Sequence, residues 1–281
     1  MKFDKLSKQA LDYWFLSKER IFTDFKKNTP EFENKNHRRI FIDRGSDILF
    51  IAHLDTVLLP QIKTITAGRI YAQGLDDRLG CYTAYKLSKK LGVDLLITDN
   101  EETAQSTAQY HTCKNYNWIV EFDRAGCDVV SYGIDNPAFL KVLNNYFEVG
   151  VGSFTDICFL DTKSCCVNIG IGYYKAHAKN SYVDLDIYDS QIETFLEFFS
   201  KHKTEKFVVD EGVEKTPLFK DYSVFPAYEE GGLLQCEWCG EDCYREDLKR
   251  VGGLLVCDMC VEDVKDYNYS CAKDEGEVFN V

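Results

Sequence analysis

The order of apolar and polar positions predicts a chain of alternating strands and helices. Four short apolar runs have the length of buried strands. These runs are 48–52, 93–98, 117–122 and 165–171. Three longer segments carry apolar side chains at helical spacing. These segments are 77–91, 136–146 and 189–202. The alternation predicts an α/β fold of three layers, α/β/α, around a central mixed, mostly parallel sheet.

Shorter signals predict the remaining elements. Residues 4–27 have the apolar spacing of one amphipathic helix, and residues 103–110 are expected to form a short helix. A basic stretch with alternating apolar residues at 38–42 and a short run at 129–132 are interpreted as strands. Residues 63–72 have the pattern of a hairpin.

The composition is that of a chain with a full apolar core. Its 281 residues are 45% hydrophobic, enough for one sizeable α/β domain and a smaller appendage. The start of the chain has no apolar leader segment, and no run of about 18 apolar residues occurs. We therefore expect a cytoplasmic protein without a membrane span. In that compartment the 12 cysteines are thiols or metal ligands rather than disulfides.

The negative charge is concentrated in the C-terminal part. The net charge is −13; residues 1–204 hold 25 Lys and Arg against 27 Asp and Glu, and residues 205–281 hold 8 against 19. Binding a nucleic-acid backbone needs an excess of basic side chains, so we expect no nucleic-acid partner. The acidic tail serves either solubility or contact with a protein partner.

Composition also divides the chain into three parts. Residues 1–204 carry the strand and helix pattern of one domain. Residues 205–235 are polar and irregular, which predicts a linker. Residues 236–281 are predicted to form a small zinc-binding module.

Two Cys-x2-Cys pairs separated by 17 residues define this module. Their cysteines are Cys236, Cys239, Cys257 and Cys260. The spacing is typical of a structural Zn²⁺ site with four thiolate ligands. The order of knuckle, hairpin, knuckle and helix resembles a treble-clef or zinc-ribbon module. Cys243 is an alternative to one of the four ligands.

Five short segments carry histidine and carboxylate side chains at or just beyond predicted strand ends. These side chains are His53 and Asp55, Asp76 and Asp77, Glu101 and Glu102, Asp123, and His177. Open α/β sheets place their sites beyond the carboxyl ends of the strands, so these groups are expected to converge. Carboxylates and imidazoles are ligands for a pair of divalent ions.

Each segment taken alone has an ordinary structural explanation. A His-x-Asp pair is common, and carboxylates before a helix cap its amides or interact with its dipole. Asp123 and His177 would then be plain loop residues. Only the joint arrangement points to a two-metal site. In such a site one aspartate bridges the ions, and one of two adjacent glutamates is the general base.

The segments resemble, in the same order, the motifs of the di-zinc aminopeptidase family and its zinc-peptidase relatives. The matching segments are 52–56, 74–80, 99–103 and 168–177, and the resemblance extends over residues 40–202. Segment 75–80 is most similar to the tetrahedral aminopeptidase branch. The resemblance implies that His53, Asp76 and Asp123 hold one Zn²⁺. It implies that Asp76, Glu102 and His177 hold a second.

The resemblance also implies roles for the neighbours of these ligands. Glu101 would be the general base that activates water. Asp55 would orient the imidazole of His53. The peptide bond between Asp76 and Asp77 would be cis.

The chain departs from the larger relatives in its spacing. The gap from His53 to Asp76 is 23 residues and that from Asp123 to His177 is 54, too short for the inserted domains of those relatives. This layout implies a minimal catalytic domain, as in the compact monomeric aminopeptidases. Segment 152–156 resembles one that lines the substrate site. There Asp156 would either hold a substrate amine or belong to a structural turn.

The leading hypothesis is a two-metal hydrolase of peptide or amide bonds, above all an aminopeptidase. One alternative is an N-acyl amino acid deacylase, another small-molecule amidase or a single-zinc cyclase on the same fold. Another is a non-catalytic scaffold that recruits a partner through the zinc module. The presence of Glu101 favours an enzyme, because a scaffold needs the metal ligands but not the base.

Overall fold

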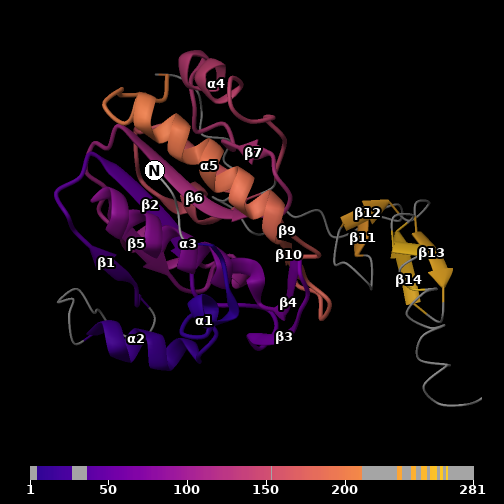
Figure 1. Ribbon diagram of the computed structural model, residues 1–281. Coiled ribbons are helices and arrows are strands. Elements are labelled where there is room, and N and C mark those ends of the chain that lie inside the picture. The colour runs from indigo at the N-terminus through magenta and orange to yellow at the C-terminus, as the bar shows by residue number, and fades with distance from the viewer. Residues whose placement is uncertain are drawn as a thin grey trace, which may run out of the picture. The chain divides into compact units, whose positions relative to one another are not determined.

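The structure is a computed structural model that describes residues 5–26, 37–152 and 154–210 (Figure 1). In the C-terminal part it describes residues 233–235, 242–244, 248–251, 254–257, 260, 261 and 264. The chain divides into two compact units. They are Met1–Tyr174 with Lys179–Thr216, and Lys175–Ala178 with Pro217–Val281. The domain boundaries expected at residues 204 and 235 stay predictions.

A six-stranded sheet forms the centre of the first unit. Its strands are β1 (Ile40–Ile42), β2 (Ile48–His53), β5 (Asp94–Thr98), β6 (Trp118–Arg124), β7 (Val129–Val130) and β8 (Cys166–Gly170). Their order is β1-β5-β2-β6-β8-β7. The middle four strands run parallel, and β1 and β7 are antiparallel edges. The predicted α/β class with a mixed, mostly parallel sheet is confirmed, and the four apolar runs are its central strands.

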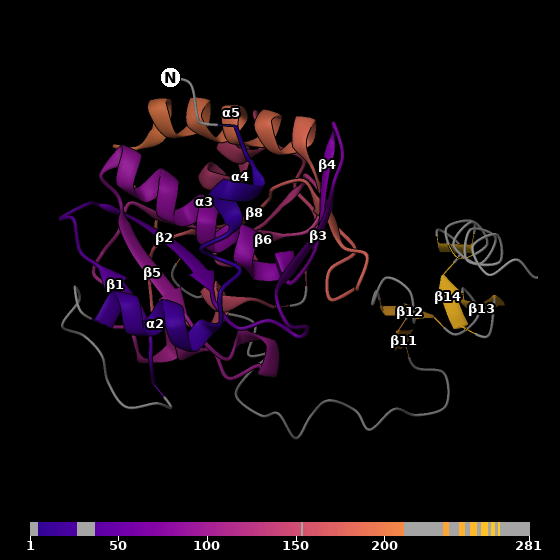
Figure 2. The same cartoon turned by 60° about the horizontal axis from the view of Figure 1, so that its bottom comes forward.

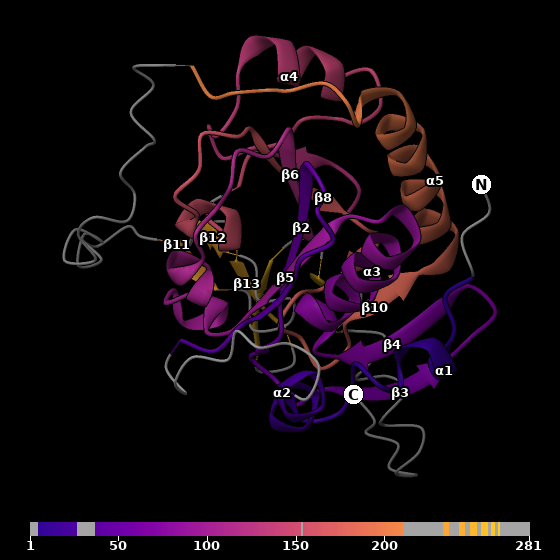
Figure 3. The same ribbon diagram turned by 90° about the vertical axis from the view of Figure 1, so that its left-hand side faces the viewer.

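Helices cover the two faces of this sheet unequally. The helices are α1 (Lys8–Leu11), α2 (Lys18–Lys26), α3 (Leu75–Leu91), α4 (Pro137–Leu143) and α5 (Leu185–His202), and the 3-10 helices are η1 (Glu101–Thr103), η2 (Thr107–Tyr110) and η3 (Asp156–Phe159). The long helices α3 and α5 lie side by side on one face (Figures 1 and 3). The other face packs against η2, η3 and their loops.

Successive side chains of β2 point alternately into the apolar cores on the two faces of the sheet. Phe50 points to the helical face, where its ring centroid lies 5.4 Å from that of Phe122 and 5.6 Å from that of Phe195 in α5. Leu49 and Ile51 are buried in the core cluster of the opposite face. Both sets are removed from water because successive strand residues point to opposite faces. This rigid strand ends at His53, so its last side chain has a fixed position.

A second, antiparallel sheet contains the predicted hairpin. Its strands are β3 (Gln61–Ile65), β4 (Arg69–Gln73), β10 (Tyr182–Asp184) and β9 (Tyr173–Tyr174), in the order β3-β4-β10-β9. The hairpin expected over 63–72 is confirmed as β3 and β4. Strand β4 leads through Gly74 directly into α3.

The single helix predicted over 4–27 is wrong, because α1 and α2 are separate. The carbonyls of Trp14 and Leu16 accept hydrogen bonds of 2.6 and 2.8 Å from Nη1 of Arg78. A continuous helix would use these carbonyls for its own amides. The hydroxyl of Ser17 accepts from the amide of Arg20 at 3.3 Å and so caps the start of α2.

Two other helix predictions need correction. The helix expected over 103–110 is replaced by η1 and η2, and the hydroxyl of Ser106 caps η2 through the amide of Ala108 at 3.0 Å. The helix expected from residue 189 begins earlier, at Leu185. The carboxylate of Asp184 accepts from the amide of Ile187 at 3.3 Å and extends that helix by one turn.

The second unit contains two short strand pairs. They are β11 (Leu233–Gln235) with β12 (Asp242–Tyr244), and β13 (Leu248–Val251) with β14 (Leu254–Cys257). Cys257 and Cys260 are buried in a small cluster with Leu248, Val256 and Val264. Cys236 and Cys239 lie outside the described residues, so the four-thiolate zinc site stays a prediction. No helix within the described ranges is long and apolar enough to cross a membrane.

Candidate metal centre

The carboxyl ends of the parallel strands bring the predicted ligands together. His53 is the last residue of β2, Asp123 the last but one of β6, and Glu101 and Glu102 follow β5 in η1. Asp76 stands at the start of α3. Since these strands are parallel neighbours, residues far apart in sequence meet at one edge of the sheet.

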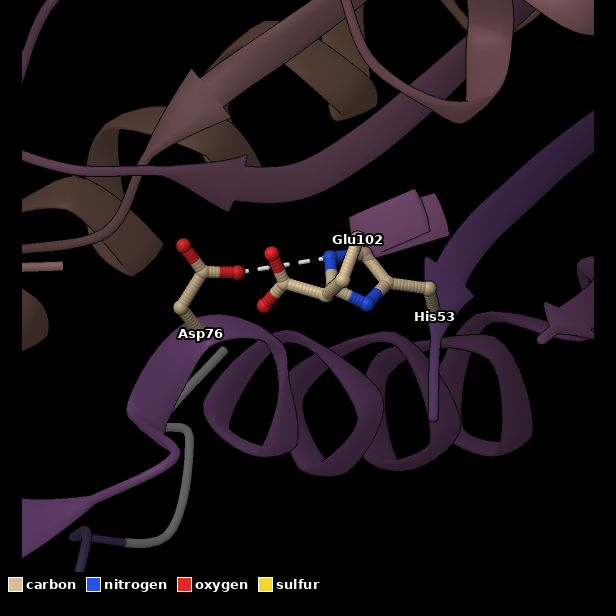
Figure 4. A group of neighbouring side chains, drawn as sticks. All are labelled: His53, Asp76 and Glu102. Carbon is tan, nitrogen blue, oxygen red and sulfur yellow. Dashed lines mark ion pairs between the residues drawn. The ribbon is translucent and has the colours of Figure 1, made fainter. Parts of the chain in front are cut away.

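The imidazole of His53 lies at the centre of these groups. Its Nε2 is 3.3 Å from Oδ1 of Asp76, 3.4 Å from Oδ1 of Asp123 and 3.7 Å from Oε2 of Glu101. Two groups have ligand atoms within 4.8 Å of one another: His53, Asp76 and Glu102, and His53, Glu101 and Asp123. Figure 4 shows the first group, with the carboxylates of Asp76 and Glu102 facing the imidazole.

A divalent cation fits this arrangement. Nε2 of His53 and Oδ1 of Asp123 are buried and have no hydrogen-bond partner within the described part of the chain. Buried polar atoms are normally satisfied, so two such atoms 3.4 Å apart point to a shared ligand. Ligands about 2.0–2.1 Å from a tetrahedral Zn²⁺ lie roughly 3.3–3.4 Å from each other. The separations of Nε2 from Asp76 and Asp123 match this value.

Adjacent aspartates at the start of α3 have different partners. The peptide bond between Asp76 and Asp77 is cis, as the resemblance implies. The Asp77 carboxylate is fully buried, and accepts from the amide of His53 at 3.2 Å and from that of Gly80 at 2.9 Å. It therefore caps the helix and ties it to β2. The Asp76 carboxylate is directed to His53 (Figure 4).

Asp55 makes contacts that the resemblance does not imply, and its role in orienting His53 stays a prediction. Its carboxylate accepts from the amides of Glu101 at 3.2 Å and of Glu102 at 3.1 Å. Nδ1 of His53 lies 3.1 Å from the backbone oxygen of Asp55 and 3.6 Å from its carboxylate. The carbonyl is therefore the closer acceptor for Nδ1–H, which leaves the Nε2 lone pair for a cation. The carboxylate positions the two glutamates.

Three side chains that sequence reasoning missed hold Asp123. The hydroxyl of Thr155 donates to Oδ2 of Asp123 at 3.0 Å, and that of Tyr173 donates to its backbone oxygen at 2.6 Å. The amide oxygen of Asn168 accepts from the Asp123 amide at 3.0 Å. Asn168 carried a signal, because a polar residue in an otherwise apolar strand needs a hydrogen-bond partner. Asp123 is thus oriented with Oδ1 toward His53.

The carboxylates of the centre share a strongly negative environment. Burial and the charge of Asp123 raise the pKa of Glu101 to about 10. Burial and the charge of Asp76 raise the pKa of Asp123 to about 7. Burial favours a neutral His53 ring, but Glu101 and Asp123 raise its pKa well above the usual value. A cation would lower the carboxylate pKa values, because a nearby positive charge favours the ionised form.

Glu121 adds to this charge in an unexpected way. It lies two residues before Asp123 in β6, is fully buried, and neither carboxylate oxygen has a hydrogen-bond partner among the described residues. Burial and the charges of Asp156 and Asp123 raise the pKa of Glu121 well above the usual value. The structure therefore has a further buried carboxyl group, that of Glu121, close to the candidate ligands, which the sequence motifs did not indicate.

Two predicted residues are not members of the groups just described. Asp156 is fully buried at the start of η3, where it accepts from the hydroxyls of Ser106 and Thr98. This position favours the structural turn over contact with a substrate amine. His177 is exposed, has a φ of 60°, and belongs to the segment Lys175–Ala178 of the second unit. Its place on a second ion stays a prediction.

Comparison with known proteins identifies the fold. No family model and no curated protein sequence matches the chain. A tripeptidase structure from Staphylococcus aureus is similar, with a TM-score of 0.50 and 11% identity, over 70% of this chain and 100% of that chain. At this identity the likeness shows the fold alone.

Two further solved structures have lower scores. Aminopeptidase PepT from Bacillus cereus has a TM-score of 0.48 and 11% identity, over 68% of this chain and 96% of that chain. The TET1 peptidase of Pyrococcus horikoshii has a TM-score of 0.48 and 12% identity, over 68% of this chain and 97% of that chain.

Proposed function

We propose that the chain is a two-metal hydrolase of peptide or amide bonds, above all an aminopeptidase. The observation that carries the proposal is a pair of buried atoms at the end of a parallel sheet, Nε2 of His53 and Oδ1 of Asp123, that have no hydrogen-bond partner among the described residues. Three carboxylates lie within 3.7 Å of that nitrogen. A protein that used these groups only for stability would give them partners.

In this proposal the ligands would divide between two ions. His53, Asp76 and Asp123 would hold one ion, and Asp76, Glu102 and His177 would hold the other. Bound divalent ions supply Lewis acidity, which lowers the pKa of water and polarises a carbonyl oxygen.

In this proposal Glu101 is first the general base and then the general acid. Its carboxylate lies beside the His53 imidazole, and its amide is held by Asp55. Glu101 accepts a proton from the attacking water as the carbon–oxygen bond forms. It then gives that proton to the leaving nitrogen as the carbon–nitrogen bond breaks. The products are a carboxylic acid and an amine, which balances the addition of one water.

The Glu101→Gln variant tests this role. It keeps the size of the side chain and the backbone contacts with Asp55 but cannot accept the proton. We expect the same ion content as the wild type by elemental analysis and a fall in turnover of about 10³-fold, within the range of general acid–base catalysis. The assay uses a panel of aminoacyl and N-acyl amino acid fluorogenic substrates.

The panel also separates the leading proposal from its alternatives. Turnover of aminoacyl substrates supports an aminopeptidase, and turnover of N-acyl substrates alone supports a deacylase. A variant as active as the wild type would remove Glu101 from the mechanism. No turnover on any substrate, with the full ion content bound, would favour a scaffold.

We also propose a third, structural Zn²⁺ in the C-terminal module. Burial of Cys257 and Cys260 in one small cluster supports the ligand set Cys236, Cys239, Cys257 and Cys260. Replacing Cys260 by Ser should lower the zinc content from three ions per chain to two and leave the Glu101-dependent turnover detectable. A content that does not change would contradict the site. Contact with a protein partner through the acidic tail remains a prediction.

A further inference from the structure

Two cations from outside the metal centre hold the segment that carries its glutamates. Nζ of Lys18 in α2 lies 2.8 Å from Oδ1 of Asp99, and Nε of Arg38 lies 2.5 Å from Oδ2. The Asp99 side chain is only 2% exposed, against 30% for Lys18 and 14% for Arg38. The carboxylate is therefore enclosed by both partners, unlike a surface ion pair.

Asp99 fixes the backbone that leads to Glu101 and Glu102. Its amide donates to the hydroxyl of Thr107 at 2.9 Å, and its carbonyl accepts from the Thr107 amide at 2.9 Å. Its carboxylate accepts from the amide of Asn100 at 3.1 Å. Asn100 has a φ of 65°, which sets a tight turn into η1. A displacement of Asp99 would therefore also displace Glu101 and Glu102.

The same part of the chain also holds the start of α3. Nη1 of Arg78 donates to the carbonyls of Trp14 and Leu16, and the side chain is almost fully buried. Arg78 comes two residues after Asp76. The break between α1 and α2 is what exposes these two carbonyls to the guanidinium.

Arg38 links α2 to Asp99 in a second way. Its guanidinium lies 4.5 Å from the ring centroid of Phe22 in α2, while its Nε binds Asp99. Figure 2 shows α2 lying next to β1, the strand that Arg38 precedes. Residues 14–18 and Arg38 thus contact two segments that carry candidate ligands, residues 99–102 and the start of α3.

We propose that residues 14–18 are a positioning element for the metal centre. Lys18 and Arg38 set the position of Glu101 and Glu102 through Asp99. The carbonyls of Trp14 and Leu16 set the position of Asp76 through Arg78. None of these side chains touches an ion; each acts through a residue that carries or adjoins a ligand. The inference uses the proposed ligand set, but not the proposed reaction.

A double-mutant cycle on Lys18 and Asp99 tests the coupling. Lys18→Met keeps the aliphatic stem and removes the charge, and Asp99→Asn removes the acceptor charge with little change in shape. The readout is Zn²⁺ affinity, measured by competition with a chromogenic chelator on the full chain. We expect each single variant to bind about 10- to 100-fold more weakly, as when groups that orient metal ligands are removed. The Zn²⁺ affinity of the double variant should be no lower than that of the single variant with the lower affinity.

The matched control is Arg20→Gln on the same helix. Arg20 pairs with Asp24 at 2.9 Å, but its side chain is 66% exposed and does not reach the 99–102 segment. Zn²⁺ affinity should stay within about twofold of the wild type, since exposed pairs contribute little. Arg38→Lys is a milder second variant that keeps a charge but loses the Nε donor. It should weaken binding several-fold even if Lys18→Met does not fold.

Melting temperature separates positioning from simple stability. If Lys18→Met and Arg38→Lys lower the melting temperature but bind Zn²⁺ as the wild type does, the N-terminal segment only stabilises the fold. Additive losses in the double variant would also overturn the proposal, because Lys18 would then act independently of Asp99. Chelator competition needs no substrate, so these outcomes do not depend on whether the chain is a peptidase.

Discussion

The two ends of the central sheet bury carboxylates under opposite conditions. At the amino end of β5, Asp94 is fully buried, and its Oδ1 accepts from the amides of Arg44 at 2.8 Å and Ser46 at 3.1 Å. Its Oδ2 lies 2.8 Å from Nζ of Lys114 and accepts from the hydroxyl of Tyr116 at 3.2 Å. Both oxygens are satisfied by the protein.

At the carboxyl end, within the part of the chain that the structure describes, Asp123 has a carboxylate hydrogen bond on Oδ2 and none on Oδ1. Burial and the charge of Asp76 raise its pKa, and the opposing effect of His53 does not offset them. Among the described residues, the fold thus compensates both carboxylate oxygens of Asp94 but only one of Asp123. The negative potential that remains favours a bound cation. The carboxylate charges are then stabilised by metal binding rather than by folding.

The largest expected effect comes from removing charge at the carboxyl end. Asp123→Asn should weaken binding of the first Zn²⁺ by more than about 10³-fold, or roughly 4 kcal/mol. In the presence of a chelator, the same variant should be as stable as the wild type or more so, because a poorly compensated charge is lost. Competition titration and urea unfolding measure the two quantities. A marked loss of stability without metal would contradict the comparison.

The corresponding change at the amino end should affect folding instead. Asp94→Ala leaves the amides of Arg44 and Ser46 and the charge of Lys114 without their acceptor. We expect the free energy of unfolding to fall by about 3 kcal/mol, with Zn²⁺ affinity unchanged. Glu197→Gln, which loses only an exposed pair with Lys201, is the control and should change stability by less than about 0.5 kcal/mol.

A smaller effect is expected at the junction of β2 and α3. A Cβ atom on Gly80 would lie 1.9 Å from Oδ1 of Asp77, so Gly80→Ala must displace that carboxylate. The lost hydrogen bonds to the amides of His53 and Gly80 should cost about 1–2 kcal/mol of unfolding free energy and loosen metal binding. Gly68→Ala is the control, because nothing lies within 4 Å of its Cβ position. Equal stability of the two variants would rule out a rigid Asp77 cap.

A pH dependence is expected from the part of the core near Asp94. Burial and the charge of Arg39 lower the pKa of His111 to about 4, from 6.5. Between these values the unfolded chain binds the proton more readily. Stability should therefore fall as the pH decreases from 6.5 to 4, by at most about 1.4 kcal/mol per pH unit.

Comparison with His111→Gln isolates this contribution. The difference in unfolding free energy between wild type and variant should depend on pH only in that window. The carboxylates of the metal centre have raised pKa values, so without metal their contribution has the opposite sign and weakens as the pH rises. A constant difference across the window would show that His111 is not held neutral by the fold.

Most of the fold could be predicted because its signals are local. The apolar runs became the central strands, and Gly92 ends α3 with a φ of 70°. The N-terminal break could not be predicted from periodicity, since it depends on Arg78, which lies more than 60 residues away. The cap of Ser106 likewise overrides the helical pattern of 103–110.

The candidate site divides in the same way. His53, Asp76, Glu101, Glu102 and Asp123 were all predicted as one set, and the structure brings them together. Their positions follow strand ends, which the apolar runs define. Their supports, such as Thr155 and Tyr173, were missed because hydroxyl residues carry no spacing signal.

Which residues meet could be predicted from the sequence, because the carboxyl ends of parallel strands lie at the same edge of a sheet. Only the tertiary structure decided which atoms face each other. It brought the Asp76 carboxylate to 3.3 Å from the His53 imidazole, turned the Asp55 carboxylate to two backbone amides, and left Nε2 of His53 without a hydrogen-bond partner among the described residues. Such choices depend on side-chain direction and on contacts between distant segments, which periodicity along the chain does not encode.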